Sequence, residues 1–272
     1  MERRSRRNLL DYPVDLWRPP SYRPASHGWS ALRTRIDRFF DLQSATIWRD
    51  LSEVLPDVRG SVLDVGCGLQ PYRHLFHPGV RYHGIDDAEA KSHFGFDVED
   101  VVYYSGNRWP VQDRRMDFIL CTETLEHLPD PRRFLSEAIR CLRPGGQALF
   151  TVPFAVRWHY IPHDYWRYTP SGLERLLRQA GFVDIRVWAR GNVATVACYK
   201  GMALFFSLLF PGPMGPLRAL GSRLLGLTCS PIVVLLATIA HLTGGSDGTT
   251  DCIGYTVQAT RPGTAVPKRR RP

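Results

Sequence analysis

The sequence predicts an α/β fold in which a mostly parallel sheet is covered by helices on both faces. Short apolar runs alternate along the chain with helical patterns, which is typical of parallel strands joined by helical crossovers. One of these runs ends in the glycine turn Gly66-Cys67-Gly68, as expected where a buried strand passes into a loop. With 272 residues, of which 44% are hydrophobic and 22% charged, the chain can bury a sizeable core.

The expected elements follow from local patterns along the chain. Within 31–55 apolar residues recur at helical spacing, which predicts one or two amphipathic helices. Helices are also expected at 131–142, which the Pro/Gly cluster 143–146 ends, and at 170–180, which Gly181 closes. Shorter apolar runs predict six strands, at 61–65, 82–85, 116–121, 147–152, 183–188 and 252–259.

These patterns divide the chain into four segments: an N-terminal arm with helices (1–50), the core of the sheet (51–192), an apolar helical insertion (193–245), and the last core strand with a basic tail (246–272). The insertion contains two apolar runs, 203–210 and 231–240, each shorter than the roughly 20 residues that a membrane-spanning helix needs. It predicts either a helical pair that caps the site or packs in a dimer, or a shallow contact with a membrane surface.

The charge and the cysteines bear on the surroundings of the protein. Lysine and arginine number 35 against 26 acidic residues, and much of this +9 excess lies at the two ends of the chain. Such ends are either solvated tails or segments attracted to phosphate, in nucleic acid or in anionic lipid. The six cysteines form no Cys-x-x-Cys pair, and no apolar run follows the basic N-terminus. We therefore expect a cytoplasmic protein that is either free or associated with a membrane.

The glycine turn and the strand after it predict a nucleoside site. Gly66 and Gly68 let the backbone approach a ligand, and their N–H groups can receive a carboxylate. Asp86, twenty residues after Gly66, ends the next strand, where a carboxylate can accept hydrogen bonds from both ribose hydroxyls. Pro71 stands where a dinucleotide-binding turn needs a third glycine. A nucleoside such as S-adenosylmethionine is therefore favoured over a nicotinamide dinucleotide.

The segment Val62-Leu63-Asp64-Val65-Gly66-Cys67-Gly68 resembles motif I of the class I S-adenosylmethionine-dependent methyltransferases. The segments 109–111, 116–118, 123–128 and 142–146 are similar to the branch called methyltransferase type 11, and the likeness runs from about 61 to 187. The resemblance implies a Rossmann-like, seven-stranded, mostly parallel sheet. In this fold the last two strands usually form a near-direct hairpin, whereas in this chain the apolar insertion comes before the last strand. It also implies S-adenosylmethionine as the cofactor.

The same resemblance implies residue roles around that cofactor. The loop Asp64 to Gly68, including Gly66 and Cys67, would hold the methionine end. Asp86 would bind the ribose, with Asp87 beside it. Cys121 and Thr122 would lie under the cofactor, and His127, next to Glu126, would lie near it.

The sequence departs from this branch in the segment that is expected to contact the adenine. The branch usually has an aspartate a few residues before its Leu-Pro-Phe, and this aspartate contacts the adenine amino group. In this chain Ser105-Gly106 stands in that place, before Trp109-Pro110-Val111. Serine can still bond to adenine, or Asp97 does so at a shifted register, and both alternatives stay open.

The stretch 152–169 should roof the site, because it follows a strand whose carboxyl end borders the pocket. It is similar to a Pro-Phe…His-x-x-Pro-x-Asp-x-x-Arg-Tyr-Thr segment of some members of the branch. Methyl transfer to a hydroxyl needs a base, for which His159 is the first candidate and His163 the second. Asp164 would orient a histidine or bind substrate, and Arg167 would pair with an acidic group.

Simpler roles exist for the same residues. Asp164 and Arg167 can form an ion pair that only locks the loop, and Glu126 can be a helix-start carboxylate. No metal is expected at His159, His163 and Asp164, because no further ligands follow at recognisable spacing.

The leading hypothesis is an O-methyltransferase that acts on a small-molecule, glycan or lipid-linked acceptor. One alternative is a cofactor-fold protein that has lost catalysis and serves as a scaffold. Another is an RNA methyltransferase, although a nucleic-acid partner is not expected because no RNA-binding module is recognisable. The oligomeric state is not predicted.

Overall fold

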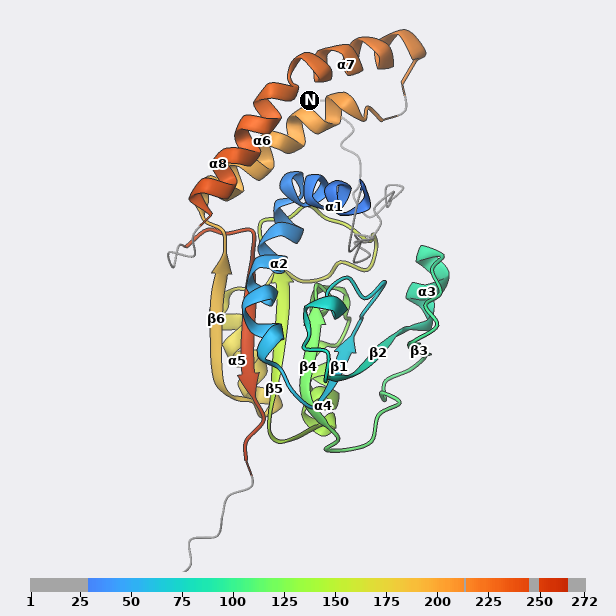
Figure 1. The fold of residues 1–272 in the computed structure, drawn as a ribbon, viewed down its shortest axis with the longest axis vertical. Helices are drawn as coiled ribbons and strands as arrows, with labels where there is room; N and C mark the ends of the chain where they lie inside the picture. The colour runs from blue at the N-terminus through green and yellow to red at the C-terminus, as the bar shows by residue number, and fades with distance from the viewer. Residues whose placement is uncertain (1–28, 213, 245–249, 264–272) are drawn as a thin grey trace, which may run out of the picture.

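The computed structural model describes residues 29–212, 214–244 and 250–263, so the predicted arm at 1–28 and most of the basic tail lie outside the described residues. Its centre is a seven-stranded sheet with the strand order β3-β2-β1-β4-β5-β7-β6 (Figure 1). β7 runs antiparallel to its neighbours β5 and β6, and the other neighbouring strands are parallel. The predicted mostly parallel Rossmann-like sheet is therefore confirmed. Its strands are β1 (Ser61–Val65), β2 (Arg81–Asp87), β3 (Val101–Tyr104), β4 (Met116–Thr122), β5 (Leu142–Pro153), β6 (Val183–Arg190) and β7 (Gly254–Thr260).

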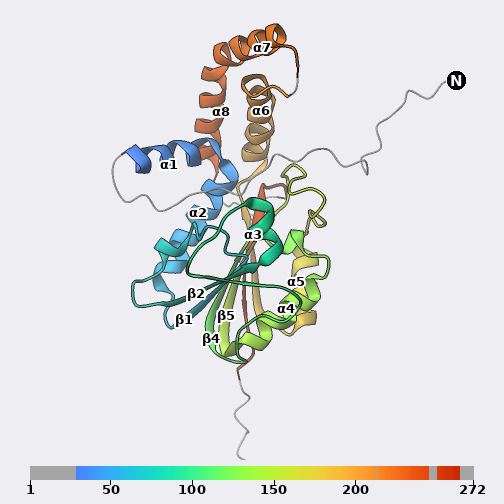
Figure 2. The same ribbon diagram turned by 90° about the vertical axis from the view of Figure 1, so that its right-hand side faces the viewer.

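Helices cover both faces of the sheet, as Figure 2 shows. On one face α2 (Leu42–Val54) packs its apolar residues against side chains of β1, β4 and β5. On the other face lie α4 (Pro131–Cys141) and α5 (Pro170–Ala180), with Phe134 and Leu173 in the same core cluster. Because each helix has one apolar stripe, burial of that stripe fixes which side faces the sheet. Short 3-10 turns also occur at η1 (Leu55–Asp57), η2 (Arg73–Leu75) and η3 (Leu125–His127).

The helix ends follow the capping residues of the sequence. Asp130 accepts a hydrogen bond from Arg133 N at the start of α4, and Thr169 accepts one from Gly172 N at the start of α5. Gly181 then ends α5 with φ of 101°, a left-handed conformation that glycine adopts without strain. The predicted helix at 170–180 is therefore confirmed to the residue.

Two elements near the site were not predicted from the sequence. These are β3, an edge strand of four residues, and α3 (Ala88–Phe94), a helix of seven. Both are too short to show a clear period, so only their packing on β2 defines them. β5 also begins earlier than expected, at Leu142, because Gly145 N and Gly146 O pair with the backbone of Arg261.

The insertion between β6 and β7 forms three helices, α6 (Val193–Leu209), α7 (Pro216–Thr228) and α8 (Ser230–Thr243), where the sequence predicted two. They project beyond the carboxyl ends of the parallel strands, with α1 (Trp29–Phe40) across their base (Figures 1 and 2). α6 and α8 share a small core that includes Met202 and Ala237. Among the described helices none is long and apolar enough to cross a membrane alone. α7 and α8 meet that test only as a pair, with a bend of 49° between them.

Candidate active site

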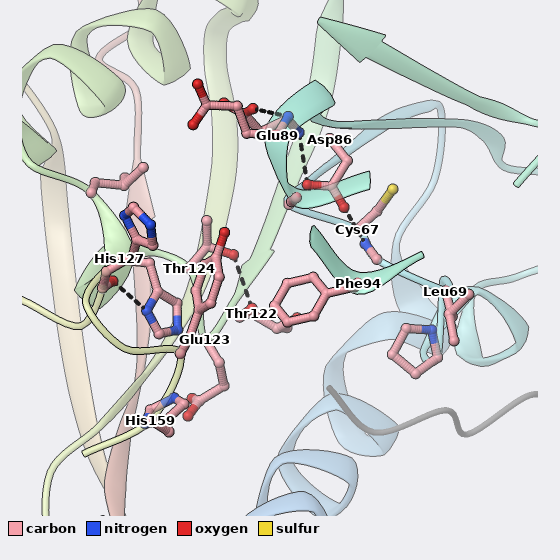
Figure 3. A pocket seen from close by; sticks show the side chains of 18 of the residues that line it. Cys67, Leu69, Asp86, Glu89, Phe94, Thr122, Glu123, Thr124, His127 and His159 are labelled. Atoms are coloured by element: carbon pink, nitrogen blue, oxygen red, sulfur yellow. Dashed lines mark hydrogen bonds between the residues drawn. The ribbon is translucent and has the colours of Figure 1, made fainter. Parts of the chain in front are cut away.

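A cavity of about 580 Å³ opens where β1, β2 and β4 end. Its wall includes the glycine turn after β1, the end of β2, the segments after β3 and β4, the loop after β5, residues of α2 and α3, and Tyr199 of α6. Figure 3 shows Cys67 and Asp86 on one side of this space and His127 and His159 on the other. Ligands of open α/β sheets bind at the carboxyl ends of the strands, so the position agrees with the predicted site.

The glycine turn brings bare backbone to the cavity. Gly66 has φ of +69° and Gly68 has φ of +51°, in the left-handed region that favours glycine. A Cβ atom on Gly66 would lie 2.4 Å from Oγ1 of Thr124, whereas one on Gly68 would meet nothing within 4 Å. Glycine is therefore required at 66 by a close contact with the segment after β4, and at 68 by backbone conformation alone.

Asp86 ties this turn to β2. Its Oδ2 accepts a hydrogen bond from Gly68 N and its Oδ1 accepts one from Asp87 N, both at 2.8 Å. Burial raises its pKa to about 6, although these two backbone hydrogen bonds act in the opposite direction. Each carboxylate oxygen can accept a second hydrogen bond. Asp86 lines the cavity, so it retains acceptor capacity for a pair of ribose hydroxyls.

Most of the predicted cofactor residues line the cavity: Gly66, Cys67, Gly68, Asp86, Asp87, Ser105, Gly106, Thr122 and His127. Two do not. Asp64 lies beneath the turn, where its Oδ2 accepts a hydrogen bond from Tyr82 at 2.6 Å and burial raises its pKa to about 7. Cys121 is buried within β4. Direct contact of Asp64 or Cys121 with a ligand therefore does not fit this geometry, because both belong to the layer behind the cavity wall.

The two alternatives for the adenine contact lie in different surroundings. Ser105 and Gly106 line the cavity, together with Asn107. Asp97 does not line it and pairs instead with Lys91 at 2.8 Å, with its side chain largely exposed. Of the two alternatives, only Ser105-Gly106 lies at the cavity.

A buried polar cluster lies at the histidine side of the cavity and consists of Glu126, His127 and His159. Nε2 of His127 is 3.6 Å from Oε1 of Glu126, and the two histidine rings are 5.0 Å apart. Burial raises the pKa of Glu126 well above its usual range, and the charge of Glu123 adds to this. Burial lowers the pKa of His127 to about 4, so its ring is neutral at neutral pH. One ligand atom from each of the three lies within 4.8 Å of the others, so these residues can exchange a proton or hold a cation.

The loop after β5 roofs the cavity as predicted, and His159, Tyr160 and His163 line it. The backbone of Glu126 anchors this loop by accepting hydrogen bonds from Tyr165 N and Trp166 N. The roof therefore rests on the same short turn that carries the polar cluster.

Asp164 and Arg167 lie behind the roof and do not line the cavity. Oδ2 of Asp164 is 3.2 Å from Nδ1 of His159, and both oxygens accept hydrogen bonds from Arg167, at 2.5 and 2.7 Å. Burial alone would raise the pKa of Asp164, but the hydrogen bonds from Arg167 and His159 outweigh it and hold that pKa below its usual range. Asp164 therefore orients a histidine, as one alternative expected. Arg167 pairs with the acidic group of Asp164, which is the ion pair that the sequence offered as a simpler role for these two residues.

Sequence reasoning missed other residues at this site, including the four members of two contacts between distant segments and lining residues such as Asn107 and Tyr199. Glu123 lines the cavity and accepts a hydrogen bond at 2.8 Å from Arg190, a fully buried arginine at the end of β6. The ring of Tyr160 lies 4.8 Å from that of Phe94 on α3, so the roof contacts the cofactor side of the cavity. Glu123 and Arg190 are 67 residues apart in the chain, and Phe94 and Tyr160 are 66 apart, so no local pattern indicates these contacts.

The fold and the site define a nucleoside-binding protein of the class I methyltransferase type. A family model described as a methyltransferase domain matches residues 33–187, which is more than half of the chain. The chain therefore belongs to this methyltransferase family, as the motifs predicted.

Individual relatives agree with this membership. A ubiquinone biosynthesis O-methyltransferase of Aromatoleum aromaticum is 32% identical over 160 residues, which cover 49% of this chain and 68% of that protein. An uncharacterized methyltransferase of Mycobacterium sp. (strain JLS) is 33% identical over 111 residues, 39% of this chain and 44% of that protein. The match thus spans less than half the length of the latter relative. A solved S-adenosylmethionine-dependent methyltransferase of Thermotoga maritima has the same fold, with a TM-score of 0.51 at 15% identity, covering 86% of this chain and 96% of that one.

Proposed function

We propose that this protein transfers a methyl group from S-adenosylmethionine to a hydroxyl oxygen of a small acceptor carried by a lipid. The observation that carries the proposal is the shared cavity, in which the glycine turn and Asp86 face a group of histidines across one space (Figure 3). The family supports methyl transfer. Relatives named as ubiquinone biosynthesis O-methyltransferases support oxygen as the atom that accepts the methyl group.

The residues present fit S-adenosylmethionine. The bare backbone of the turn at 66–68 suits the amino-acid end, and Asp86 has acceptor capacity for the ribose. Ser105 and Gly106 lie where the adenine is expected, and Thr122 ends β4 beneath this space. When bound, the cofactor supplies an electrophilic methyl group on its sulfonium sulfur. The protein contributes by holding the acceptor oxygen in line with that group.

Cofactor affinity is expected to depend on pH through Asp86. Its pKa is about 6, and only the ionised carboxylate can accept hydrogen bonds from both ribose hydroxyls. Binding that selects the ionised form is full above this pKa and weakens by up to about tenfold per pH unit below it. Titration calorimetry with S-adenosylhomocysteine at several pH values measures the effect. Asp86→Asn should bind more weakly and remove this dependence, and a wild-type affinity that rises on acidification would contradict the assignment.

The acceptor side combines aromatic walls with histidines. Tyr160 contacts Phe94 and also the ring of His127, at 5.2 Å between centroids, so a flat ring fits beside them. The histidines that line the cavity supply the group that takes the hydroxyl proton, as was predicted for His159 and His163. A phenolic hydroxyl is the acceptor that this wall suits best.

The insertion supports a lipid-carried acceptor and a site at an anionic membrane. Its helices expose many large apolar side chains, among them Leu217 at 84%, Leu224 at 59% and Leu242 at 81%. No acidic residue occurs between Asp184 and Asp247, whereas Lys200, Arg218 and Arg223 are basic. An apolar surface with only basic charges complements anionic lipid. Tyr199 of α6 lines the cavity, so the insertion connects this surface with the site.

We place the protein on the cytoplasmic side of that membrane. All six cysteines are free thiols, which suits a reducing compartment.

Turnover tests the function and the lipid surface together. The assay measures S-adenosylhomocysteine formed from S-adenosylmethionine with a prenylated catechol, either in anionic phosphatidylglycerol vesicles or as a short-chain soluble analogue. Leu217→Asp with Leu224→Asp should lower the vesicle rate by about tenfold or more, because charged residues partition poorly into lipid, and should leave the soluble rate unchanged.

Val102→Asp is the matched control, since Val102 is 53% exposed but lies on the edge strand β3. Cofactor binding without turnover of either acceptor would favour the inactive scaffold. Equal vesicle rates for the wild type and the double variant would remove the membrane surface from the proposal. If the surface that carries Leu217 and Leu224 binds a second copy of the chain instead of lipid, light scattering of the wild type will show a dimer.

A further inference from the structure

The polar cluster beside the cavity contains a carboxylate that the fold leaves uncompensated. Glu126 is 0% exposed, and among the described residues neither of its carboxylate oxygens has a hydrogen-bond partner. A buried charge without a partner costs several kcal/mol. Nε2 of His127 lies 3.6 Å from Oε1 of this carboxylate. A group outside the described residues, such as a proton or a bound cation, is therefore needed to compensate this carboxylate.

The two neighbouring histidines are oriented by oxygen acceptors. Nδ1 of His127 lies 2.8 Å from the carbonyl oxygen of His163. Nδ1 of His159 lies 3.0 Å from the carbonyl oxygen of Arg157 and 3.2 Å from Oδ2 of Asp164. A neutral ring held in this way carries its proton on Nδ1 and presents Nε2 as the lone-pair atom. Histidines that bind metal ions nearly always have their other nitrogen on a carbonyl or a carboxylate in this manner.

We propose that Glu126, His127 and His159 form a binding site for a divalent cation on the wall of the cavity. Their donor atoms lie within 4.8 Å of one another, so small side-chain rotations bring them to the bond lengths of about 2.0–2.2 Å that such ions need. Two imidazole nitrogens with one carboxylate suit a first-row transition ion such as Zn²⁺ or Mn²⁺. Mg²⁺ and Ca²⁺ prefer oxygen ligands alone.

The cation site deepens the proposed function and, for its chemical role, rests on it. His127 and His159 line the cavity, so a cation that they held would lie within reach of an acceptor there. A cation held there would lower the pKa of the acceptor hydroxyl, whose O–H bond would break with transfer of the proton to His163, which also lines the cavity. The oxygen then forms a bond to the methyl carbon, and the electrons of the C–S bond stay on sulfur. His159 acts in this scheme as a ligand, and His163 takes the role of base.

Binding of the metal alone is the first test. Protein freed of metal by a chelator is titrated with ZnCl₂, MnCl₂ or MgCl₂ in a calorimeter, and one ion per chain is expected, with affinity in the order Zn²⁺, Mn²⁺, Mg²⁺. Glu126→Gln and His127→Gln should each lower the Zn²⁺ affinity by more than about 100-fold, the upper end of losses seen for outer-shell partners. His163→Gln is the matched control, a cavity histidine outside the cluster, and should retain the affinity.

Circular dichroism of each variant establishes that it is folded, and the near-isosteric Glu126→Gln keeps the test valid if His127→Gln unfolds. The absence of Zn²⁺ and Mn²⁺ binding, or equal affinity in Glu126→Gln, would overturn the site in favour of a protonated Glu126. Chelation should abolish turnover while leaving S-adenosylhomocysteine binding intact. Zn²⁺ binding at the cluster without any turnover would leave the site standing and remove the proposed function. Full turnover after chelation would leave the proposed function standing and remove the cation site.

Discussion

Gly66→Ala is expected to lower the affinity for S-adenosylmethionine by about 100-fold or more. The added Cβ would lie 2.4 Å from Oγ1 of Thr124, a distance that real Cβ atoms do not show, so the turn must move. The φ of +69° adds strain of about 1–2 kcal/mol for any residue with a side chain, and each 1.4 kcal/mol is about a factor of ten in affinity. Titration calorimetry with the cofactor and with S-adenosylhomocysteine measures the loss.

Two further variants distinguish the steric overlap of the new Cβ atom from the strain of the positive φ. Gly68→Ala introduces strain without overlap, because nothing lies within 4 Å of the new Cβ, and should lose only about tenfold in affinity. Thr124→Ala in the Gly66→Ala background removes the two closest atoms and should recover affinity to a similar level. If Gly66→Ala bound the cofactor as tightly as the wild type, the turn after β1 could not be the cofactor site.

Glu123→Ala is expected to reduce the free energy of unfolding by about 3–5 kcal/mol. It leaves Arg190, which is fully buried, without its carboxylate partner at 2.8 Å. The backbone oxygen of Val152, at 3.0 Å, would then be the closest remaining acceptor. Breaking one side of a buried ion pair costs this much because the other charge stays in a medium of low polarity.

The double variant Glu123→Leu with Arg190→Met is the decisive comparison. It removes both charges, so most of the lost stability should return, in agreement with the general behaviour of buried pairs replaced by apolar residues. Urea denaturation followed by circular dichroism measures all three proteins. A loss of less than about 1 kcal/mol in Glu123→Ala would show that Arg190 is held by backbone and solvent alone.

The location of the insertion relates its exposed apolar surface to the proposed reaction. α6 begins directly after β6 and carries Tyr199 to the cavity, while α7 and α8 extend away from it. The exposed Leu217 and Leu224 belong to α7, and Leu242 belongs to α8. Both helices lie beyond the carboxyl ends of the parallel strands (Figure 2). The cavity opens at this same edge of the sheet. A lipid-carried acceptor could reach the site from a bilayer that binds this surface, and the vesicle assay tests that route.

Local features of the sequence determined the central part of the fold and the cofactor side. The turn at 66–68 and Asp86 were identified because glycine conformation and strand ends follow from neighbouring residues. The helix at 170–180 was identified in full, since its cap residues and its apolar stripe lie within a few positions of one another. The family membership followed from the same local segments.

Only the tertiary structure decided which polar groups meet. Glu126 and His159 are 33 positions apart, and Glu123 and Arg190 are 67 apart, so no spacing rule connects them. β3 and α3 were missed because elements of four and seven residues carry too little pattern, and packing on β2 defines them. A parallel sheet brings the ends of its strands together across long sequence distances. Burial at that edge then sets the charge state of each side chain, which a linear sequence does not display.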